Sequence, residues 1–60
     1  MKEFTWEAYN INDECIGGGS VYSINLYDAG KQIEKQIDDE IDKWKESGYF
    51  THKIVNIMEK

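Results

Sequence analysis

One segment of the chain, Gln32–Ser47 (QIEKQIDDEIDKWKES), carries an apolar stripe with the period of an α-helix. At roughly 100° per residue, its larger apolar side chains fall within an arc of about 80°. These side chains are Ile33, Ile37, Ile41 and Trp44. An arc this narrow is typical of a helix that lies on one surface, so one face of the segment is committed to a hydrophobic core.

The opposite face of this helix carries carboxylates where ion pairs would have been easy to place. Asp38, Asp42 and Glu46 follow one another at i, i+4 spacing, and Asp39 lies beside them. Like charges at this spacing destabilise an isolated helix, which indicates a role in contacting a basic protein. The simpler interpretation is a solvated face, partly neutralised by pairs such as Asp39 with Lys43.

Two segments before the helix alternate in polarity, as half-buried strands do. They are residues 3–11 (EFTWEAYNI) and residues 20–27 (SVYSINLY). The core-facing side chains are expected to be Phe4, Trp6, Ala8, Tyr22, Ile24 and Leu26. Residues 12–19 hold turn formers and three consecutive glycines, so they predict a flexible hairpin loop.

The helix is expected to begin after Asp28, whose carboxylate can accept hydrogen bonds from the free N–H groups of the first turn. It should run to about Glu46, with Gly48 as the C-terminal stop. Residues 49–58 are rich in β-branched and aromatic side chains and predict a third strand.

The register of that third strand is open between two sets of side chains. The preferred set faces Phe50, Ile54 and Met58 toward the helix, with His52 between them. The other set is Val55 with Ile57. A β-bulge in the strand would let both sets contribute to the core.

The order ββαβ predicts an α+β fold in which a three-stranded sheet, of order 2-1-3, carries one amphipathic helix on one face. Residues 1–60 are expected to form a single small domain. The other sheet face would expose Tyr9, Ile11, Val21, Tyr27, Val55 and Ile57. A patch of this kind predicts a homodimer through that face or a strand edge, whereas the alternative is a monomer with scattered apolar side chains.

The charge balance limits the kinds of partner. Twelve acidic residues face seven lysines, arginine is absent, and the net charge is −5. Binding to phosphates needs clustered cations, so direct binding of nucleic acid is not expected. The chain has neither an apolar leader segment nor an apolar run long enough for a membrane, which predicts a cytoplasmic protein without membrane contact.

Groups that carry chemistry are sparse. Cys15 is the only cysteine, which excludes an internal disulfide and a cysteine-based zinc site. Cys15 is expected to lie far from His52, the only histidine, so the two cannot form a nucleophile and base pair. His52 is interpreted as a strand residue whose side chain has its hydrogen bonds satisfied. The glycine run lacks the Gly-Lys-Ser/Thr ending of a phosphate loop. We therefore predict no enzyme, no catalytic residue, no metal and no cofactor.

The sequence thus favours a non-catalytic module that binds and inhibits a basic protein, including one that binds nucleic acid. The contact residues would be Asp38, Asp39, Asp42 and Glu46. In size, charge and lack of catalytic groups, the chain resembles the small acidic phage proteins that inhibit host enzymes or nucleoid proteins, some of them DNA mimics. Carboxylates one helical turn apart repeat at about 5 to 6 Å, near the spacing of phosphates along one strand.

The alternative function is a structural module for homodimerisation or assembly. Its contact would use the exposed sheet face, with Tyr9, Ile11, Val21 and Tyr27. A third reading, in which the tyrosines stack on nucleic-acid bases, is disfavoured because the acidic chain would repel a phosphate backbone.

Overall fold

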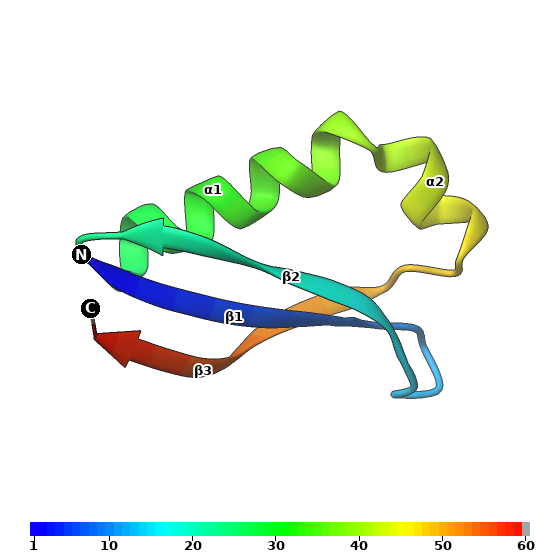
Figure 1. Ribbon diagram of the computed structural model, residues 1–60. Helices are drawn as coiled ribbons and strands as arrows, with labels where there is room; N and C mark the ends of the chain where they lie inside the picture. The colour runs from blue at the N-terminus through cyan, green and yellow to red at the C-terminus, as the bar shows by residue number, and fades with distance from the viewer. Residues whose placement is uncertain (60) are drawn as a thin grey trace.

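The computed structural model describes residues 1–59 and has a three-stranded sheet with two consecutive helices on one face (Figure 1). The elements are β1 (Lys2–Tyr9), β2 (Cys15–Ser23), α1 (Leu26–Asp39), α2 (Ile41–Glu46) and β3 (Thr51–Glu59). β1 is central and pairs antiparallel with both β2 and β3. The predicted α+β fold and the sheet order β2-β1-β3 are therefore confirmed.

The glycine run lies inside β2, so the prediction of a flexible loop over residues 12–19 is wrong. Gly17, Gly18 and Gly19 all pair with β1. A Cβ at Gly17 would lie 3.0 Å from the Trp44 ring, and one at Gly19 would lie 3.2 Å from Nε1 of Trp6. The two indoles pack against each other with centroids 5.7 Å apart. Gly17 and Gly19 thus form a glycine surface on β2, free of side chains, against which the two tryptophans pack.

The connection between β1 and β2 is instead a short turn around Asn10. The side-chain oxygen of Asn10 accepts hydrogen bonds from the backbone N–H groups of Asn12, at 2.9 Å, and Glu14, at 3.0 Å. Asp13 adopts a φ of 64°, a left-handed conformation that Asp tolerates better than most residues. The asparagine side chain therefore closes the hairpin without any glycine.

The faces of β2 are the reverse of those predicted from its alternation. Val21 pairs with Phe4 on the helix side and is buried, whereas Tyr22 pairs with Glu3 on the open side. Ser23 is the next buried residue on the helix side. Its hydroxyl can be buried because it donates a hydrogen bond to the carboxylate of Asp28 in α1. Apolar residues occupy both faces of this segment, so polarity alone did not determine which face is buried.

Strand β2 ends at Ser23, so the last two of its predicted core residues lie elsewhere. Ile24 is in the turn before α1, and Leu26 is the first residue of that helix; both are exposed. The N-cap of α1 is Asn25, whose side-chain oxygen accepts a 2.8 Å hydrogen bond from the N–H of Asp28. The predicted cap at Asp28 is therefore wrong by about one turn.

The carboxylate of Asp28 instead binds two side chains within this helix start. It accepts hydrogen bonds from the Ser23 hydroxyl at 2.7 Å and from the Gln32 amide at 2.8 Å. These bonds, that of Ser23 first, lower the pKa of Asp28 below its ordinary 3.8. The ionised carboxylate thereby joins the end of β2 to the first two turns of α1.

This carboxylate should give the protein an acid-dependent stability. Because the pKa of Asp28 is lower in the folded than in the unfolded chain, its contribution is complete above about pH 4 and is lost as the pH falls through the folded value. Urea midpoints measured from about pH 5 to pH 2 should fall less steeply in Asp28→Asn than in the parent protein. Parallel acid profiles for the two proteins would contradict this role.

The predicted single helix is broken at Glu40, whose φ of −125° and ψ of 32° are not helical. Its N–H still bonds to the carbonyl of Ile37, at 3.2 Å, and α2 begins with the next residue. The change of direction lets Trp44 of α2 reach the glycine surface of β2. Gly48, with a φ of 84°, terminates this region as the sequence predicted.

The core lies between the sheet and α1. Its buried side chains are Phe4, Trp6, Ala8, Val21, Ala29, Ile33 and Ile37. Five partly buried residues pack against this cluster: Ile16, Ile41, Trp44, Tyr49 and Ile54. The side chains of β1 and the predicted apolar stripe, with Trp44 now on α2, thus pack in or against the core as the sequence indicated.

Strand β3 contains the β-bulge that would let both predicted sets of side chains contribute. Ile54 pairs with Trp6 and Ile57 pairs with Phe4, both on the helix side, because the register shifts between Thr5 and Trp6. His52 pairs with Ala8 on this same side.

The preferred register of β3 is therefore wrong at two positions. Met58 pairs with Glu3 on the open face, and Phe50 precedes the strand and is exposed. The inserted residue reverses the alternation along the strand, which a period-two pattern does not anticipate.

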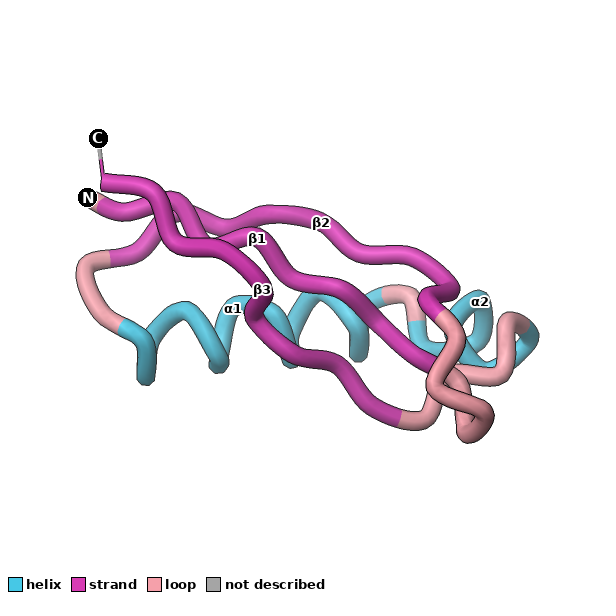
Figure 2. The backbone as a smooth tube through the Cα atoms, turned by 90° about the horizontal axis from the view of Figure 1, so that it is seen from below, coloured by secondary structure: helices cyan, strands magenta, loops and turns pink. Residues whose placement is uncertain are grey.

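The view from below shows the open face of the sheet, with α1 crossing behind it (Figure 2). α1 packs on β2, and Ile57 on the helix side of β3 remains 50% exposed. Cover by the helices is thus uneven, and β3 is the less protected edge. Over residues 1–59, no helix has both the length and the apolarity that crossing a membrane requires.

Candidate functional site

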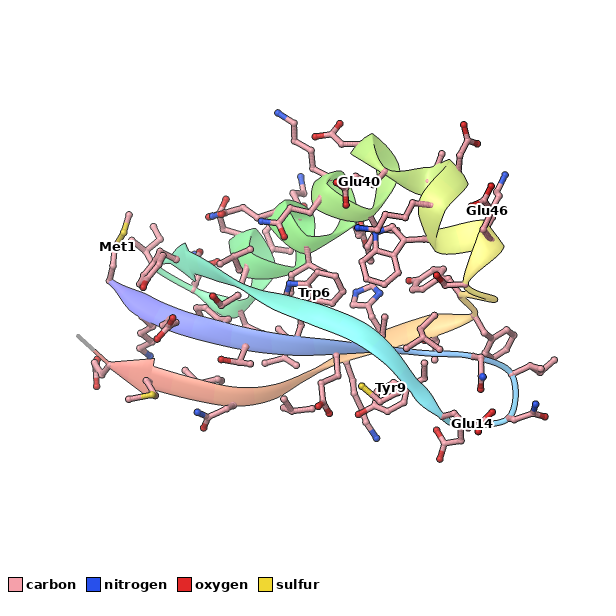
Figure 3. The ribbon with its side chains drawn as sticks, turned by 45° about the vertical axis from the view of Figure 1, so that its right-hand side comes forward. Met1, Trp6, Tyr9, Glu14, Glu40 and Glu46 are labelled. Atoms are coloured by element: carbon pink, nitrogen blue, oxygen red, sulfur yellow. The ribbon has the colours of Figure 1, made fainter. Side chains whose placement is uncertain are left out.

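The carboxylates predicted as contact residues all lie exposed on the two helices. Asp38 and Asp39 end α1, while Asp42 and Glu46 lie on α2. Glu40, at the break, is also exposed, and Figure 3 shows Glu40 and Glu46 among the side chains that project above the sheet. These five residues are called the acidic surface below.

The regular one-turn spacing predicted for these carboxylates does not extend along the acidic surface. The break at Glu40 separates Asp38 on α1 from Asp42 on α2, so only Asp42 and Glu46 share one uninterrupted helix. The comparison with phosphate spacing assumed a straight helix. The surface is therefore a cluster of negative charge rather than an evenly spaced row.

The carboxylates of the acidic surface form no ion pairs with lysines of the described residues. Among residues 1–59, no lysine ammonium lies within 4.0 Å of these carboxylates. The anticipated pair of Asp39 with Lys43 is thus not formed. Exposed pairs are worth little, so the fold loses little by their absence, and the carboxylates remain available to a partner.

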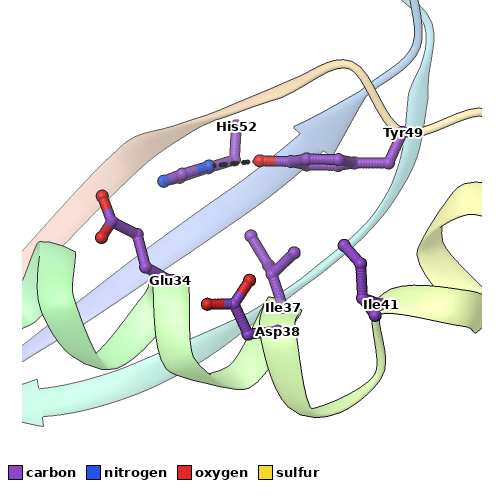
Figure 4. A pocket seen from close by; sticks show the side chains of 6 residues that line it. All are labelled: Glu34, Ile37, Asp38, Ile41, Tyr49 and His52. Atoms are coloured by element: carbon purple, nitrogen blue, oxygen red, sulfur yellow. Dashed lines mark hydrogen bonds between the residues drawn. The ribbon is translucent and has the colours of Figure 1, made fainter.

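A hollow of about 200 Å³ adjoins the acidic surface, between the helices and the start of β3 (Figure 4). Its lining residues are Glu34, Ile37, Asp38, Ile41, Tyr49 and His52. Asp38 is therefore shared by the hollow and the acidic surface. In Figure 4 the carboxylates of Glu34 and Asp38 point from α1 toward the two rings on the other side.

The two rings form one continuous plate. The Tyr49 hydroxyl and Nδ1 of His52 share a hydrogen bond of 2.7 Å, and the ring planes differ by only 19°. Trp6 packs edge-on to His52 and Trp44 packs edge-on to Tyr49, each with centroids 6.1 Å apart. Each of the two rings thus contacts one of the indoles that pack on the glycine surface.

The hollow also carries a negative potential that acts on the phenol. Desolvation first, and then the carboxylates of Glu34 and Asp38, raise the pKa of Tyr49 above its ordinary 10. The phenol therefore stays protonated over the whole physiological range of pH. Within residues 1–59, no group of three or more histidine, cysteine or acidic side chains is arranged to hold a metal ion.

Sequence reasoning missed this hollow because its lining comes from separate elements. From the sequence, His52 was interpreted as an ordinary strand residue, and Glu34 and Tyr49 were given no functional role. The i, i+4 spacing of Glu34 and Asp38 was visible, but which side of the helix faces β3 follows only from the packed structure.

The four residues predicted for a sheet-face contact do not share one surface. Tyr9 lies on the open face, where Figure 3 shows it opposite Trp6, but Val21 is buried under the helix. Ile11 is exposed in the turn after β1, and Tyr27 is exposed on α1. The predicted face therefore retains only Tyr9 of the four.

The open face is more polar than the sequence suggested. The Tyr9 hydroxyl donates a 2.6 Å hydrogen bond to Glu7, and the Lys53 ammonium lies 4.8 Å from the Tyr9 ring centroid. The hydroxyl of Tyr22 lies 3.2 Å from the carboxylate of Glu3. The aromatic residues of this face are thus engaged with charged neighbours on the same sheet.

The Tyr9 hydrogen bond has a measurable consequence. Glu7 is the main cause that raises the pKa of Tyr9 to about 12, because the bond and the negative charge both favour the neutral phenol. Glu7→Gln should bring the pKa of Tyr9 back toward 10. The ring resonances of Tyr9 in an alkaline NMR titration measure this pKa. An unchanged Tyr9 titration in this variant would show that the bond does not form in solution.

Comparison of the chain with models of known protein families, with curated proteins and with solved structures found no match. The acidic surface and the hollow are therefore the features that bear on its function.

Proposed function

We propose that this chain is a non-catalytic binding module that uses its acidic surface to bind and inhibit a basic protein in the cytoplasm. The observation that carries the proposal is the exposure of Asp38, Asp39, Glu40, Asp42 and Glu46 without a lysine partner among the described residues.

Charge clustering of this kind favours a cationic partner for a physical reason. Like charges on neighbouring turns repel one another, and cations from a partner would remove that repulsion on binding. The net charge of −5 adds a field that accelerates encounter with a basic protein and opposes nucleic acid. Inhibition would follow where the acidic surface covers the groove that the partner uses for its own anionic ligand.

Salt should weaken this binding strongly. We expect a fluorescently labelled oligolysine peptide of about eight residues to bind the full chain in low salt. Its affinity should fall at least about tenfold between roughly 50 mM and 500 mM NaCl, since the Debye length shrinks over this range. Fluorescence anisotropy measures both affinities. Absence of binding, or an affinity that does not change with salt, would refute the proposal.

A second candidate function, self-association as an assembly module, is favoured by the exposure of β3. Val55, Ile57 and Met58 are between 45% and 52% exposed on an edge strand. Such an edge offers unpaired backbone groups to a second copy. Sedimentation velocity should then give a dimer that persists in high salt and dissociates in Met58→Lys. A monomer at all concentrations would exclude this candidate.

A further inference from the structure

We propose that the hollow lined by Glu34, Ile37, Asp38, Ile41, Tyr49 and His52 is a pocket for one arginine side chain of a basic protein. This inference rests on the proposed function, because it specifies which side chain of the partner is recognised. It goes further in requiring a planar cation instead of positive charge alone.

The shape of the hollow fits a flat group. The rings of Tyr49 and His52 lie within 19° of one plane and are joined by their hydrogen bond, so they present one extended face. Figure 4 shows this plate on one side of the hollow and the side chains of α1 on the other. A guanidinium group stacks on aromatic faces, whereas an ammonium is a compact and strongly hydrated point charge.

The charges of the hollow fit the same group. Glu34 and Asp38 lie one turn apart on α1, both are exposed, and neither has a lysine partner within residues 1–59. A guanidinium carries five N–H donors in a fixed fork, so it can bond to both carboxylates while it lies against the plate. A lysine ammonium at this position would reach the carboxylates and one ring, but it has no planar surface to stack along the whole plate.

The remaining lining suits the arginine stem. Ile37 and Ile41 give the hollow an apolar wall below Tyr49, as seen in Figure 4. The methylene groups of arginine pack on such a wall while the charged head stays with the carboxylates. Because Trp6 and Trp44 hold the plate in place, little side-chain order has to be gained on binding.

Two small probes test this pocket on the full chain. N-acetyl-arginine methylamide, added during an NMR titration, should shift the ring resonances of Tyr49 and His52 with a saturating curve. N-acetyl-lysine methylamide should require at least about fivefold higher concentration for the same shift. Equal responses to the two probes, or arginine responses that spare these rings, would overturn the proposal.

A matched pair of variants locates the binding. Glu34→Gln should weaken arginine binding about tenfold, because it removes one of the two carboxylates that would bond to the guanidinium. Glu34 is informative because it lines the hollow but does not belong to the acidic surface. Glu59→Gln makes the same change in charge at the far end of β3 and should leave binding unchanged. Equal affinities in the two variants would place the arginine elsewhere.

The oligolysine titration separates the two proposals. If oligolysine binds in a salt-dependent way but the arginine probe shows no preference for the hollow, the pocket is refuted and the proposed function stands. If neither probe binds, both are refuted. Arginine binding at the hollow without any oligolysine binding would support the pocket and remove the broader acidic surface from the contact.

Discussion

Gly18→Ala is expected to destabilise the protein by about 3 kcal/mol, most of what a domain of this size has available. A Cβ at Gly18 would overlap the backbone carbonyl oxygen of Trp6 on the paired strand. Only a backbone shift can remove this overlap, because the atom that the Cβ meets belongs to the backbone and not to a flexible side chain. Such a shift would disturb the hydrogen-bonded pairing of β1 with β2. Urea unfolding followed by circular dichroism measures the loss.

Gly30→Ala is the matched control for this prediction. Apart from the adjoining residues and the backbone of α1 itself, no atom lies within 4 Å of a Cβ built at Gly30, which sits inside this helix. Alanine has a higher helix propensity and reduces the entropy of the unfolded chain, so this variant should gain about 0.5 to 1 kcal/mol. If both variants were as stable as the parent protein, close packing of the glycine strand would not explain the glycine run.

The second large effect is expected from reversing charge within the acidic surface. Asp38→Lys combined with Asp42→Lys should lower the affinity for oligolysine by at least about 100-fold, because two attractive charges become repulsive. Both side chains are exposed and form no ion pair within residues 1–59, so the fold should tolerate the exchange. Anisotropy titrations at about 150 mM salt measure the affinity, and circular dichroism checks the fold.

The control for this reversal changes the net charge equally at distant positions. Glu14→Lys with Glu59→Lys alters the turn after β1 and the end of β3, both outside the acidic surface. Affinity at about 150 mM salt should then fall by no more than about threefold, since charges farther away than the Debye length of about 8 Å are largely screened. A loss as large as that of the first pair would mean that oligolysine responds only to net charge.

Elements with one clear period were predictable from the sequence. The alternation of β1 placed Phe4, Trp6 and Ala8 in the core, and the helical period did the same for Ile33 and Ile37. The order of these elements then led to the antiparallel sheet order β2-β1-β3, because the helical crossover restricts how the strands can pair.

The sequence-based predictions were wrong at positions where a contact with another element determines which residue fits. Three glycines ordinarily signal a turn, but Gly17 and Gly19 are needed where tryptophan rings lie on β2. The helix break at Glu40 is a similar case, since the continuous apolar stripe gave no sign that Trp44 turns back to the sheet. Such features depend on contacts between elements that local periodicity does not contain.

The candidate site was predictable only in part. The exposure of Asp38, Asp39, Asp42 and Glu46 agrees with their place opposite the apolar stripe. Their even spacing was lost when the helix broke, and the hollow beside them was not predicted. The pairing of Tyr49 with His52 arises from the turn that leads into β3, where a three-residue separation brings the two rings together.

The most direct test of the central claim is parallel capture from one lysate on the parent protein, the Asp38→Lys/Asp42→Lys variant and the Glu14→Lys/Glu59→Lys control, each eluted with a salt gradient. We predict that the parent protein and the control retain the same basic protein, that moderate salt releases it, and that the first variant does not retain it. Retention of that protein by the first variant, or its release only at salt concentrations that denature it, would contradict binding through the acidic surface.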